Sequence, residues 1–365
     1  MESEIYINGR FLTQKITGVQ RFAYELSRKL TSMFNKVTFI VPGEALQNSD
    51  YGIDGFNIEY TGKHSGHLWE QYDLPQLLRK KNNPLLLNFC STAPLNYTNQ
   101  LVTIHDLAFR HGKWHSFTFR AFYNFLIPKI AKKSRHVITV SEYSKDDIIR
   151  SYNLNNDKVS VVPGAVFDES GMIPGAGIEM YREHLKSQKY ILSVGSIDPR
   201  KNIKRIIYAF LEAETADLKL FLIGAYNKNF RKDRELENLI STNKERVFFL
   251  GYKSDEELKA LYENAQLFVY PSLFEGFGLP PIEAMASGCP TLVSNCTSLP
   301  EVCGDAALYC NPHSVSDIKN QINTALFDDS VRGSLQTKGP VQAQKFSYLK
   351  SAEKLSQILE NMPPL

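Results

Sequence analysis

Cysteine is scarce in this sequence, and long apolar segments are absent from it. The 365 residues include five cysteines, an odd number, and no Cys-x-x-Cys pair, which indicates a reducing compartment and argues against a disulfide framework. No apolar run approaches the roughly 20 residues that cross a bilayer, and acidic residues precede any apolar stretch at the start of the chain. We therefore expect no membrane-spanning helix, no secretory leader and a cytoplasmic location.

Patterns that bind metal ions or nucleic acids are also missing. Cys289, Cys296, Cys303 and Cys310 recur every seven residues, but prolines interrupt the stretch and zinc ligands are usually closer together, so we interpret the row as coincidence. Without an Asp-x-Asp motif, a metal ion held by carboxylates has no obvious ligands. The formal net charge of +3 is too small to indicate nucleic acid. We expect neither a metal or other cofactor nor a nucleic-acid partner.

What the sequence does contain is an alternation of apolar runs and helical patterns. In the first half we expect strands at Glu4–Ile7, Lys36–Val41, Pro84–Phe89, Leu101–Ile104, His136–Val140 and Val159–Val162, and helices at Gln20–Leu30, at Phe117–Ala131 and from Lys145, the last capped by Ser144. In the second half we expect strands at Tyr190–Val194, Lys219–Ile223, Val247–Leu250, Leu267–Tyr270 and Thr291–Val293, and helices at Ile203–Leu211, Arg231–Leu239, Asp255–Glu263, Pro280–Ala286 and Tyr348–Met362. This order predicts parallel sheets covered by helices on both faces.

The length of the chain suits two domains. We expect an α/β protein with two facing, doubly wound Rossmann-like domains and a cleft between them. Residues 1–168 form the first domain and residues 188–347 the second. The linker, 169–187, is rich in proline and glycine, and the helix at 348–365 packs back across the domain boundary.

The stretch SLFEGFGLPPIEAMASGCPTLVSN, residues 272–295, places two carboxylates around a glycine-rich turn. Pro280 and Pro281 suit the first turn of a helix, so Glu275 lies in the loop before that helix and Glu283 within its first turns. Gly276 and Gly278 allow close backbone approach, and amides at a helix start favour phosphate. A carboxylate can accept from two adjacent hydroxyls, as Glu283 would from a ribose. The structural alternative is that Glu283 complements the helix dipole and Glu275 is a solvated charge.

A second loop of the same kind is SVGSIDPRKN, residues 193–202, which presents Arg200 and Lys201 between an expected strand and an expected helix. Two adjacent cations there can neutralise a diphosphate in place of a metal ion. The structural alternative is a pair of ordinary surface charges.

These segments together carry a family resemblance. VGSIDPRKN, LGYKSDEEL and PSLFEGFGLPPIEAMASGCP in the second half, with TGVQRFAYEL, TIHDLAFR and HVITVSEYSKDDI in the first, resemble the family-four retaining glycosyltransferases with the GT-B fold. The Glu-x7-Glu pattern with its EGFGLP core is the most specific part. The resemblance covers most of the chain and implies transfer of a hexose from a nucleotide-diphosphate sugar.

The resemblance also implies roles for individual residues. Glu275 would hold hydroxyls of the donor sugar, Glu283 the ribose diol, and Arg200 and Lys201 the diphosphate. The remaining donor contacts would come from backbone amides of Phe277, Gly278 and Leu279 beside Gly276, from the Tyr252–Lys253 backbone at the base, and from Gly18 at the diphosphate, with His105 approaching the sugar. One departure is Ser196, where relatives often carry arginine. For His105 the structural alternative is a loop histidine that caps Asp106.

The chemistry that follows is charge stabilisation. Breaking the anomeric bond leaves a positive sugar and a negative diphosphate, so preorganised cations lower the barrier, and Lys201 is the principal candidate. In the retaining family the leaving group itself takes the proton of the acceptor, so no side-chain nucleophile is needed.

A basic and aromatic segment, residues 110–135, has seven Lys or Arg residues and no acidic residue. It can rest on an anionic membrane surface at the inner face of the cytoplasmic membrane, which favours a lipid-linked acceptor such as an oligosaccharide on a polyprenyl diphosphate. The alternative is an ordinary helix whose aromatic residues face the core.

Three other functions stay open from the sequence. A nicotinamide-dependent oxidoreductase is disfavoured because GFGLPP lacks the third glycine of the Gly-x-Gly-x-x-Gly motif. A nucleotide-sugar-binding regulator without turnover is disfavoured because His105, Lys201, Glu275 and Glu283 are all present. Another GT-B enzyme, using a UDP- or dTDP-linked sugar, is the third. Our first expectation is a mannosyltransferase in bacterial surface polysaccharide assembly, such as that of O-antigen or capsule, acting on a glycan or a lipid-linked oligosaccharide.

Overall fold

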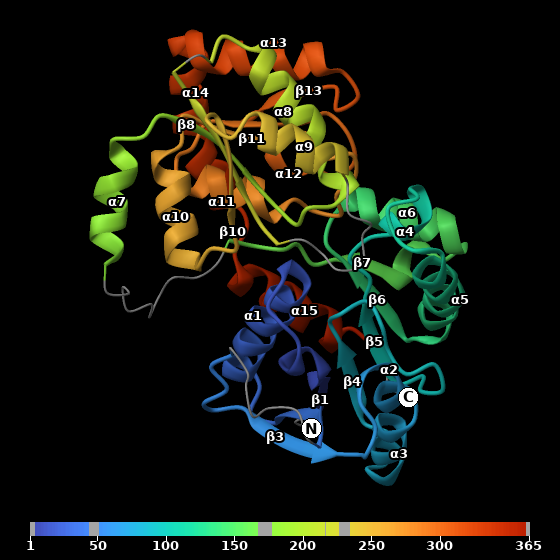
Figure 1. Ribbon diagram of the computed structural model, residues 1–365. Helices are drawn as coiled ribbons and strands as arrows, with labels where there is room; N and C mark the ends of the chain where they lie inside the picture. The colour runs from blue at the N-terminus through green and yellow to red at the C-terminus, as the bar shows by residue number, and fades with distance from the viewer. Residues whose placement is uncertain (1–3, 44–50, 167–176, 216, 226–233, 363–365) are drawn as a thin grey trace. The chain divides into compact units, whose positions relative to one another are not determined.

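The computed structural model describes residues 4–43, 51–166, 177–215, 217–225 and 234–362 (Figure 1). The chain divides into two compact units. Unit 1 comprises Met1–His111, Phe117–Ala165 and Ser347–Leu365, and unit 2 comprises Gly112–Ser116 and Val166–Phe346.

Unit 1 is built on a seven-stranded sheet with the order β3-β2-β1-β4-β5-β6-β7, in which every neighbouring pair is parallel. Its strands are β1 (Ile5–Asn8), β2 (Val37–Pro42), β3 (Asn57–Thr61), β4 (Leu85–Asn88), β5 (Gln100–Thr103), β6 (His136–Thr139) and β7 (Val159–Val161). Its helices are η1 (Gly9–Thr13), α1 (Gly18–Met33), α2 (Gly66–Gln71), α3 (Asp73–Lys80), α4 (Ala108–His111), α5 (Phe117–Lys133), α6 (Glu142–Tyr152), η2 (Asn156–Lys158) and α15 (Tyr348–Glu360).

Unit 2 is built on a six-stranded sheet with the order β10-β9-β8-β11-β12-β13, again with parallel pairs throughout. Its strands are β8 (Tyr190–Val194), β9 (Lys219–Ile223), β10 (Val247–Gly251), β11 (Leu267–Tyr270), β12 (Thr291–Ser294) and β13 (Leu308–Cys310). Its helices are α7 (Ile178–Lys186), η3 (Pro199–Lys201), α8 (Ile203–Glu212), α9 (Arg234–Thr242), α10 (Asp255–Asn264), α11 (Leu279–Ala286), α12 (Leu299–Cys303), α13 (Val315–Phe327) and α14 (Asp329–Ala343).

Both sheets are doubly wound, as the alternating pattern predicts. Strands β1, β2, β11 and β12 are buried along their whole length, which is the pattern of parallel strands with helices on both faces. In unit 2 the core joins Ile191 and Leu267 of the sheet to Phe210 of α8 and Ile322 of α13. The α/β fold class expected from the sequence is confirmed.

The expected linker and the last helix are the two segments that the sequence places outside the two main domains. Part of the expected linker, 169–187, lies outside the described residues, and its Ile178–Lys186 part forms helix α7 of unit 2. Helix α15 belongs to unit 1, where the ring of Tyr348 meets that of Phe22 at 6.4 Å and Ser351 Oγ donates to the Pro163 carbonyl at 2.8 Å.

One capping assignment from the sequence was wrong. Helix α6 begins at Glu142, and its N-cap is Ser141, whose hydroxyl accepts from the backbone N–H of Ser144 at 3.1 Å. Because β6 already ends at Thr139, the chain turns into the helix three residues earlier than expected. Ser144 therefore lies inside the first turn rather than capping it.

Candidate functional site

The loop after β8 in unit 2 is fixed by a local cap. Asp198 accepts at Oδ1 from the backbone N–H of Arg200 at 2.9 Å, and its Oδ2 accepts from the Ser196 hydroxyl at 2.8 Å. Pro199 occupies the first position of the short helix η3, where a missing N–H costs nothing. This cap places Arg200 and Lys201 on a rigid turn beyond the carboxyl end of the strand.

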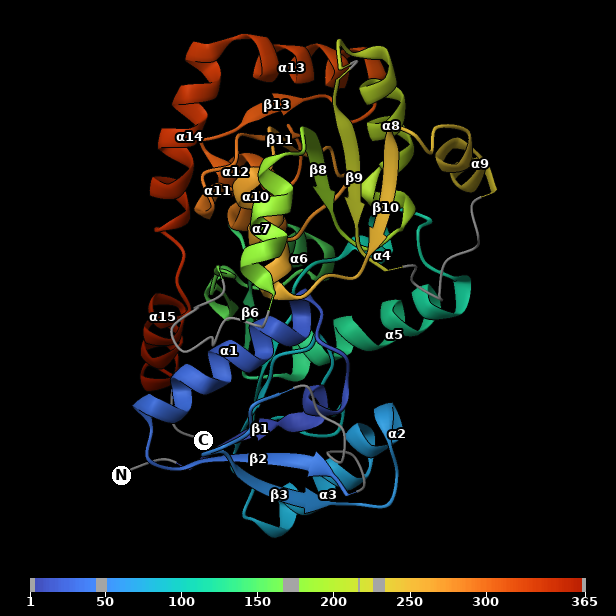
Figure 2. The same cartoon turned by 60° about the vertical axis from the view of Figure 1, so that its left-hand side comes forward.

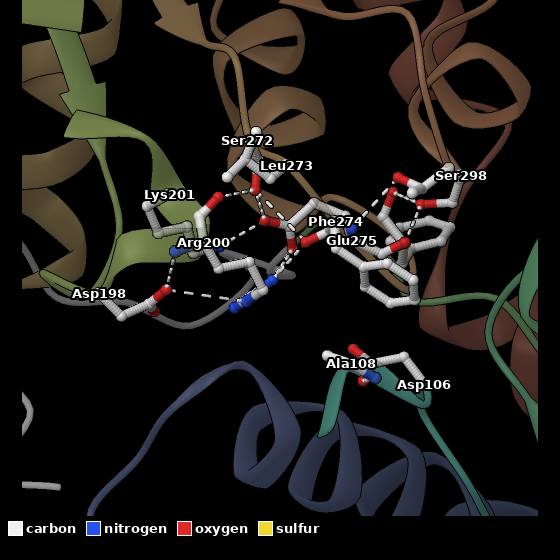
Figure 3. Close-up of polar contacts among 12 residues, drawn as sticks. Asp106, Ala108, Asp198, Arg200, Lys201, Ser272, Leu273, Phe274, Glu275 and Ser298 are labelled. Atoms are coloured by element: carbon white, nitrogen blue, oxygen red, sulfur yellow. Dashed lines mark hydrogen bonds and ion pairs between the residues drawn. The ribbon is translucent and has the colours of Figure 1, made fainter. Parts of the chain in front are cut away.

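The loop after β11 packs directly on that turn. The backbone N–H of Leu273 donates to the Arg200 carbonyl at 2.8 Å, and Arg200 Nη1 donates to the Phe274 carbonyl at 2.6 Å. Asn202, which precedes α8, donates from its side chain to the Pro271 carbonyl at 2.9 Å. Two segments about 70 residues apart in sequence therefore form one structural element, as Figure 3 shows.

An ion cluster centres on Glu275. Its Oε1 lies 2.7 Å from Lys201 Nζ, and its Oε2 lies 2.9 Å from Arg200 Nη1 (Figure 3). Asp198 is more distant, with Oδ1 3.9 Å from Arg200 Nε. Two cations thus share one carboxylate at short range. The alternative in which Arg200 and Lys201 are ordinary surface charges does not hold, because both side chains are largely buried.

Two hydroxyl groups complete the cluster. Tyr270 donates to Glu275 Oε1 at 3.0 Å, and the buried Ser272 donates to the same oxygen at 2.5 Å. Lys201 Nζ also contacts the Tyr270 hydroxyl and lies 4.7 Å from the centre of its ring. The carboxylate is therefore held in one orientation by neutral donors as well as by cations.

The pKa values of the cluster follow from this arrangement. Burial alone would raise the pKa of Glu275, but Arg200, Lys201 and the Ser272 hydroxyl outweigh burial and lower it to about 2. Burial lowers the pKa of Lys201, and the charge of Glu275 partly restores it. Glu275 is consequently an anion throughout the physiological range, which keeps the cation pair in place.

The glycine-rich turn leads from Glu275 into α11. The Ser298 hydroxyl donates to the carbonyls of Glu275 at 3.0 Å and Phe277 at 2.9 Å. Gly278 caps α11 with φ +113°, and a Cβ there would lie 2.6 Å from Leu299 Cδ2, so glycine is required. Leu279 then begins the helix.

The other expected donor contacts of unit 2 lie at the same sheet edge. Glu283 lies on α11, half-buried, and accepts at Oε2 from the Tyr262 hydroxyl at 3.2 Å. Tyr252 and Lys253 follow β10, and Lys253 Nζ pairs with Glu257 at 2.9 Å. Because β8, β10 and β11 are parallel, the segments that follow them share the carboxyl edge of the sheet.

In unit 1, His105 follows β5, and its Nε2 lies 2.8 Å from the Phe89 carbonyl. A carbonyl only accepts, so the proton sits on Nε2 and Nδ1 is the accepting nitrogen of the neutral ring. Burial lowers the pKa of His105, which favours that neutral form. Asp106 accepts instead from the Ala108 N–H at 2.9 Å, so the alternative in which His105 caps Asp106 does not hold. Gly18 is the first residue of α1.

The basic and aromatic segment, residues 110–135, contains the end of α4 and all of α5. Leu126, Ile127 and Ile130 of α5 are buried in the core, whereas Phe117 and Phe125 are 83% and 56% exposed. The alternative in which all its aromatic residues face the core therefore does not hold.

Neither a metal cluster nor a spanning helix occurs in the part of the chain that the structure describes. No group of three or more His, Cys, Asp or Glu side chains among the described residues could hold a metal ion. No helix within those residues is long and apolar enough to cross a bilayer.

Comparison with known proteins identifies the family. The model described as Glycosyl transferases group 1 matches residues 180–341, and the model described as Glycosyltransferase Family 4 matches residues 16–169. The O-antigen chain mannosyltransferase B of Escherichia coli is 34% identical over 264 residues, which cover 70% of this chain and 68% of that protein. The chain belongs to the family-four glycosyltransferases.

This glycosyltransferase is also similar to a second mannosyltransferase and to a solved structure. It is 34% identical over 249 residues to the serotype-specific mannosyltransferase WbdA of Escherichia coli, which cover 64% of this chain but 29% of the relative's own length. The structure of Anabaena HepE in complex with UDP and glucose matches with a TM-score of 0.75 at 16% identity, over 99% of this chain and 100% of that chain. The resemblance stated from the sequence and the GT-B fold are confirmed.

Sequence reasoning did not find every residue of the unit 2 site of this glycosyltransferase. Tyr270, Ser272 and Asp198 orient the charged groups, and the Thr297 hydroxyl accepts from the Glu275 N–H at 3.2 Å. The Asp-Pro pair at 198–199 is a recognisable helix-start signal. The roles of the hydroxyl groups depend on pairing between separate loops and carry no comparable local signal.

Proposed function

We propose that this glycosyltransferase is a retaining mannosyltransferase that uses GDP-mannose as donor. Both curated relatives are named mannosyltransferases, and the cluster of Arg200, Lys201 and Glu275 is the observation that carries the proposal. A diphosphate offers the cations an anionic partner of the kind that Glu275 now supplies. UDP- and dTDP-linked hexoses are the alternative donors.

In the proposed mechanism Arg200 and Lys201 bind the diphosphate and receive its negative charge as the anomeric bond breaks. Glu275 hydrogen-bonds hydroxyls of the transferred sugar, and Glu283 binds the ribose diol. Backbone amides of Phe277, Gly278 and Leu279 add donors at the start of α11. The acceptor oxygen forms the new bond on the face that the diphosphate leaves, and its proton passes to the departing diphosphate. Metal-independent turnover is part of this proposal.

The donor is identified by a thermal-shift panel of GDP-mannose, UDP-glucose, UDP-galactose and dTDP-rhamnose. A tight donor raises the melting temperature by mass action. We expect the largest shift with GDP-mannose and the same transfer rate with and without EDTA. A larger shift with a UDP- or dTDP-sugar would replace mannose in the proposal, and binding without any transfer would favour a regulator.

Glu283 provides a sharper test of the donor site. We expect Glu283→Ala to weaken donor binding about 10- to 100-fold, the loss of one charged hydrogen-bonding group. The matched control is Glu353→Ala, an exposed carboxylate on α15. Isothermal titration with donor makes the comparison, and an unchanged affinity in the Glu283 variant would remove its ribose role.

For the acceptor we propose a lipid-linked oligosaccharide in O-antigen or capsule assembly, reached at the inner face of the cytoplasmic membrane. Support comes from the O-antigen name of the first relative. It also comes from α5, where the exposed Phe117 and Phe125 lie on the same helix as the exposed Lys129, Lys132 and Lys133. Aromatic side chains beside lysines suit the headgroup region of an anionic bilayer.

Vesicle co-sedimentation tests the membrane contact. We expect wild-type protein to sediment with phosphatidylglycerol vesicles, and a variant with Lys129, Lys132 and Lys133 changed to alanine to lose most of that binding. The control variant changes three other exposed lysines, Lys244, Lys350 and Lys354, and so has the same net charge. Equal sedimentation of the two variants would end the membrane proposal.

A further inference from the structure

Unit 1 contains a buried polar network at the carboxyl ends of β1 and β4. Arg10, in η1 directly after β1, lies with Nε 3.3 Å from Glu70 Oε1 and donates from Nη2 to the Thr92 hydroxyl at 2.8 Å. Glu70 Oε1 also accepts from Asn8 Nδ2 at 2.9 Å and from the Thr92 hydroxyl at 3.1 Å. Glu70 is almost completely buried. The network therefore holds one carboxylate in a fixed position at the sheet edge.

The second oxygen of that carboxylate orients a histidine. His67 Nδ1 lies 3.4 Å from Glu70 Oε2, and the imidazole is 39% exposed. A carboxylate only accepts, so Nδ1 carries the proton and the neutral ring keeps Nε2 as an acceptor. Burial raises the pKa of Glu70, but the combined effect of His67, Arg10 and Asn8 lowers it overall. Glu70 thus remains the anion that this orientation requires.

Aromatic side chains of α5 border the histidine. The His67 ring centre lies 5.1 Å from that of Phe122 and 6.4 Å from that of Tyr123. Tyr123 is stacked on Phe119 at 4.2 Å, whereas Phe122 is 39% exposed. These ring contacts bring α5 beside α2, which in Figure 2 lies beyond the end of β2. One exposed aromatic ring and one accepting nitrogen therefore lie side by side.

This arrangement favours a neutral, hydroxylated ligand. Arg10 and Glu70 cancel each other's charge, so the pair does not favour a charged ligand. A buried ion pair also stabilises a fold less than apolar residues of the same volume would, so stability alone does not account for this pair. Ligands of parallel α/β units bind beyond the carboxyl ends of the strands. An apolar surface with a few placed polar groups is the common pattern of small-molecule sites. A pyranose ring presents an apolar C–H face to an aromatic ring and hydroxyls at its rim.

We propose that His67 and Phe122 form a subsite for a pyranose of the acceptor, with Glu70 and Arg10 as positioning residues. Phe122 contacts one face of the sugar, and His67 Nε2 accepts a hydrogen bond from one of its non-reacting hydroxyls. This subsite deepens the proposed function and rests on it, because it assigns unit 1 residues to the sugar that receives the mannose.

Saturation-transfer NMR on the full chain tests the subsite without requiring turnover. The probes are methyl α-D-mannopyranoside and methyl β-D-glucopyranoside. We expect wild-type protein to bind at least one of them, and His67→Ala and Phe122→Ala each to raise its Kd about tenfold, the loss of one hydrogen bond or one ring contact. Phe122→Tyr keeps the ring and should restore binding.

The matched control is His64→Ala, because His64 forms the other imidazole–carboxylate pair of this region, 3.0 Å from Asp73, and should bind the probes as wild type does. Fluorescence of the buried Trp69 on α2 checks that each variant is folded. The subsite is wrong if no probe binds wild-type protein, if His64→Ala weakens binding as much as His67→Ala, or if methyl phosphate displaces the sugar at equal concentration. A missing thermal shift with every nucleotide sugar would instead contradict the donor proposal and leave the sugar binding at His67 intact.

Discussion

The two units place buried charges at equivalent positions, the carboxyl edge of a parallel sheet, but they balance them differently. In unit 2 two cations, Arg200 and Lys201, converge on Glu275 within 3 Å, and the second carboxylate, Asp198, is 3.9 Å away. In unit 1 a single cation, Arg10, meets a single carboxylate, Glu70, at 3.3 Å. In unit 2 two cations therefore lie close to one carboxylate, whereas in unit 1 one cation does.

The difference indicates which ligand each edge is suited to. Two adjacent cations on one turn can bind an anion such as a diphosphate, whereas a single paired cation favours an uncharged sugar. The difference also predicts that removing a cation has different effects in the two units. Removing a cation from unit 2 leaves Glu275 with another cation, but removing Arg10 takes away the arginine partner of Glu70.

The largest expected effect is on catalysis in unit 2. We expect Lys201→Ala to lower kcat about 10²- to 10³-fold, because one preorganised charge no longer meets the departing diphosphate. The free energy of unfolding should change little, because Arg200 still neutralises Glu275. Steady-state kinetics and urea unfolding measure the two effects. A large loss of stability with unchanged kcat would mean that Lys201, like Arg10, serves mainly to neutralise a buried carboxylate.

The second effect is on stability in unit 1. We expect Arg10→Met to lower the free energy of unfolding by about 3–5 kcal/mol, because the buried Glu70 loses its arginine partner. The double variant Arg10→Met/Glu70→Gln should recover most of the loss. Unfolding is followed by Trp69, which lies in unit 1, in a Trp114→Phe background. If the double variant were no more stable than the single one, the loss would come from packing rather than charge.

The third effect is the pH dependence of the Glu275 contribution. The folded pKa of about 2 lies below the ordinary value of 4.5, so the stabilisation is complete above pH 4.5 and is lost as the pH falls through 2. We expect wild type to exceed Glu275→Gln by about 3 kcal/mol near neutral pH, from the size of the shift. Urea titrations from pH 6 to pH 3 should show the difference shrinking only below pH 4.5. A difference that shrinks already between pH 6 and pH 5 would contradict the lowered pKa.

Much of the fold was predictable because the strands are continuous apolar runs. β8 (Tyr190–Val194), β9 (Lys219–Ile223) and β11 (Leu267–Tyr270) have the predicted bounds. The polar edge strand β3 and the short helix α2 were not predicted, because NIEYT and GHLWEQ carry too few apolar residues for a period to show. The elements α12, β13, α13 and α14 were also missed, and of these α12 and β13 have only five and three residues, too few for a period to show.

The candidate site was predictable where its chemistry is local. Glu275 and Glu283 lie in one short motif, and Arg200 and Lys201 are adjacent in another. The pairing of Glu275 with Lys201 spans 74 positions and depends on the sheet bringing β8 beside β11. The role of the His67–Glu70 pair could not be predicted for the same reason. Arg10, which contacts Glu70, and Phe122, which borders His67, are distant from the pair in sequence.

The proposed function depends most on the contact of Arg200 and Lys201 with the diphosphate of the donor. The most direct measurement is isothermal titration of wild type and Lys201→Ala with the nucleoside diphosphate and the nucleoside monophosphate of the donor identified by the thermal-shift panel. Wild type should prefer the diphosphate, and Lys201→Ala should lose at least about tenfold in affinity for it while binding the monophosphate nearly as before. Equal losses for both ligands, or no loss for either, would contradict the proposed contact.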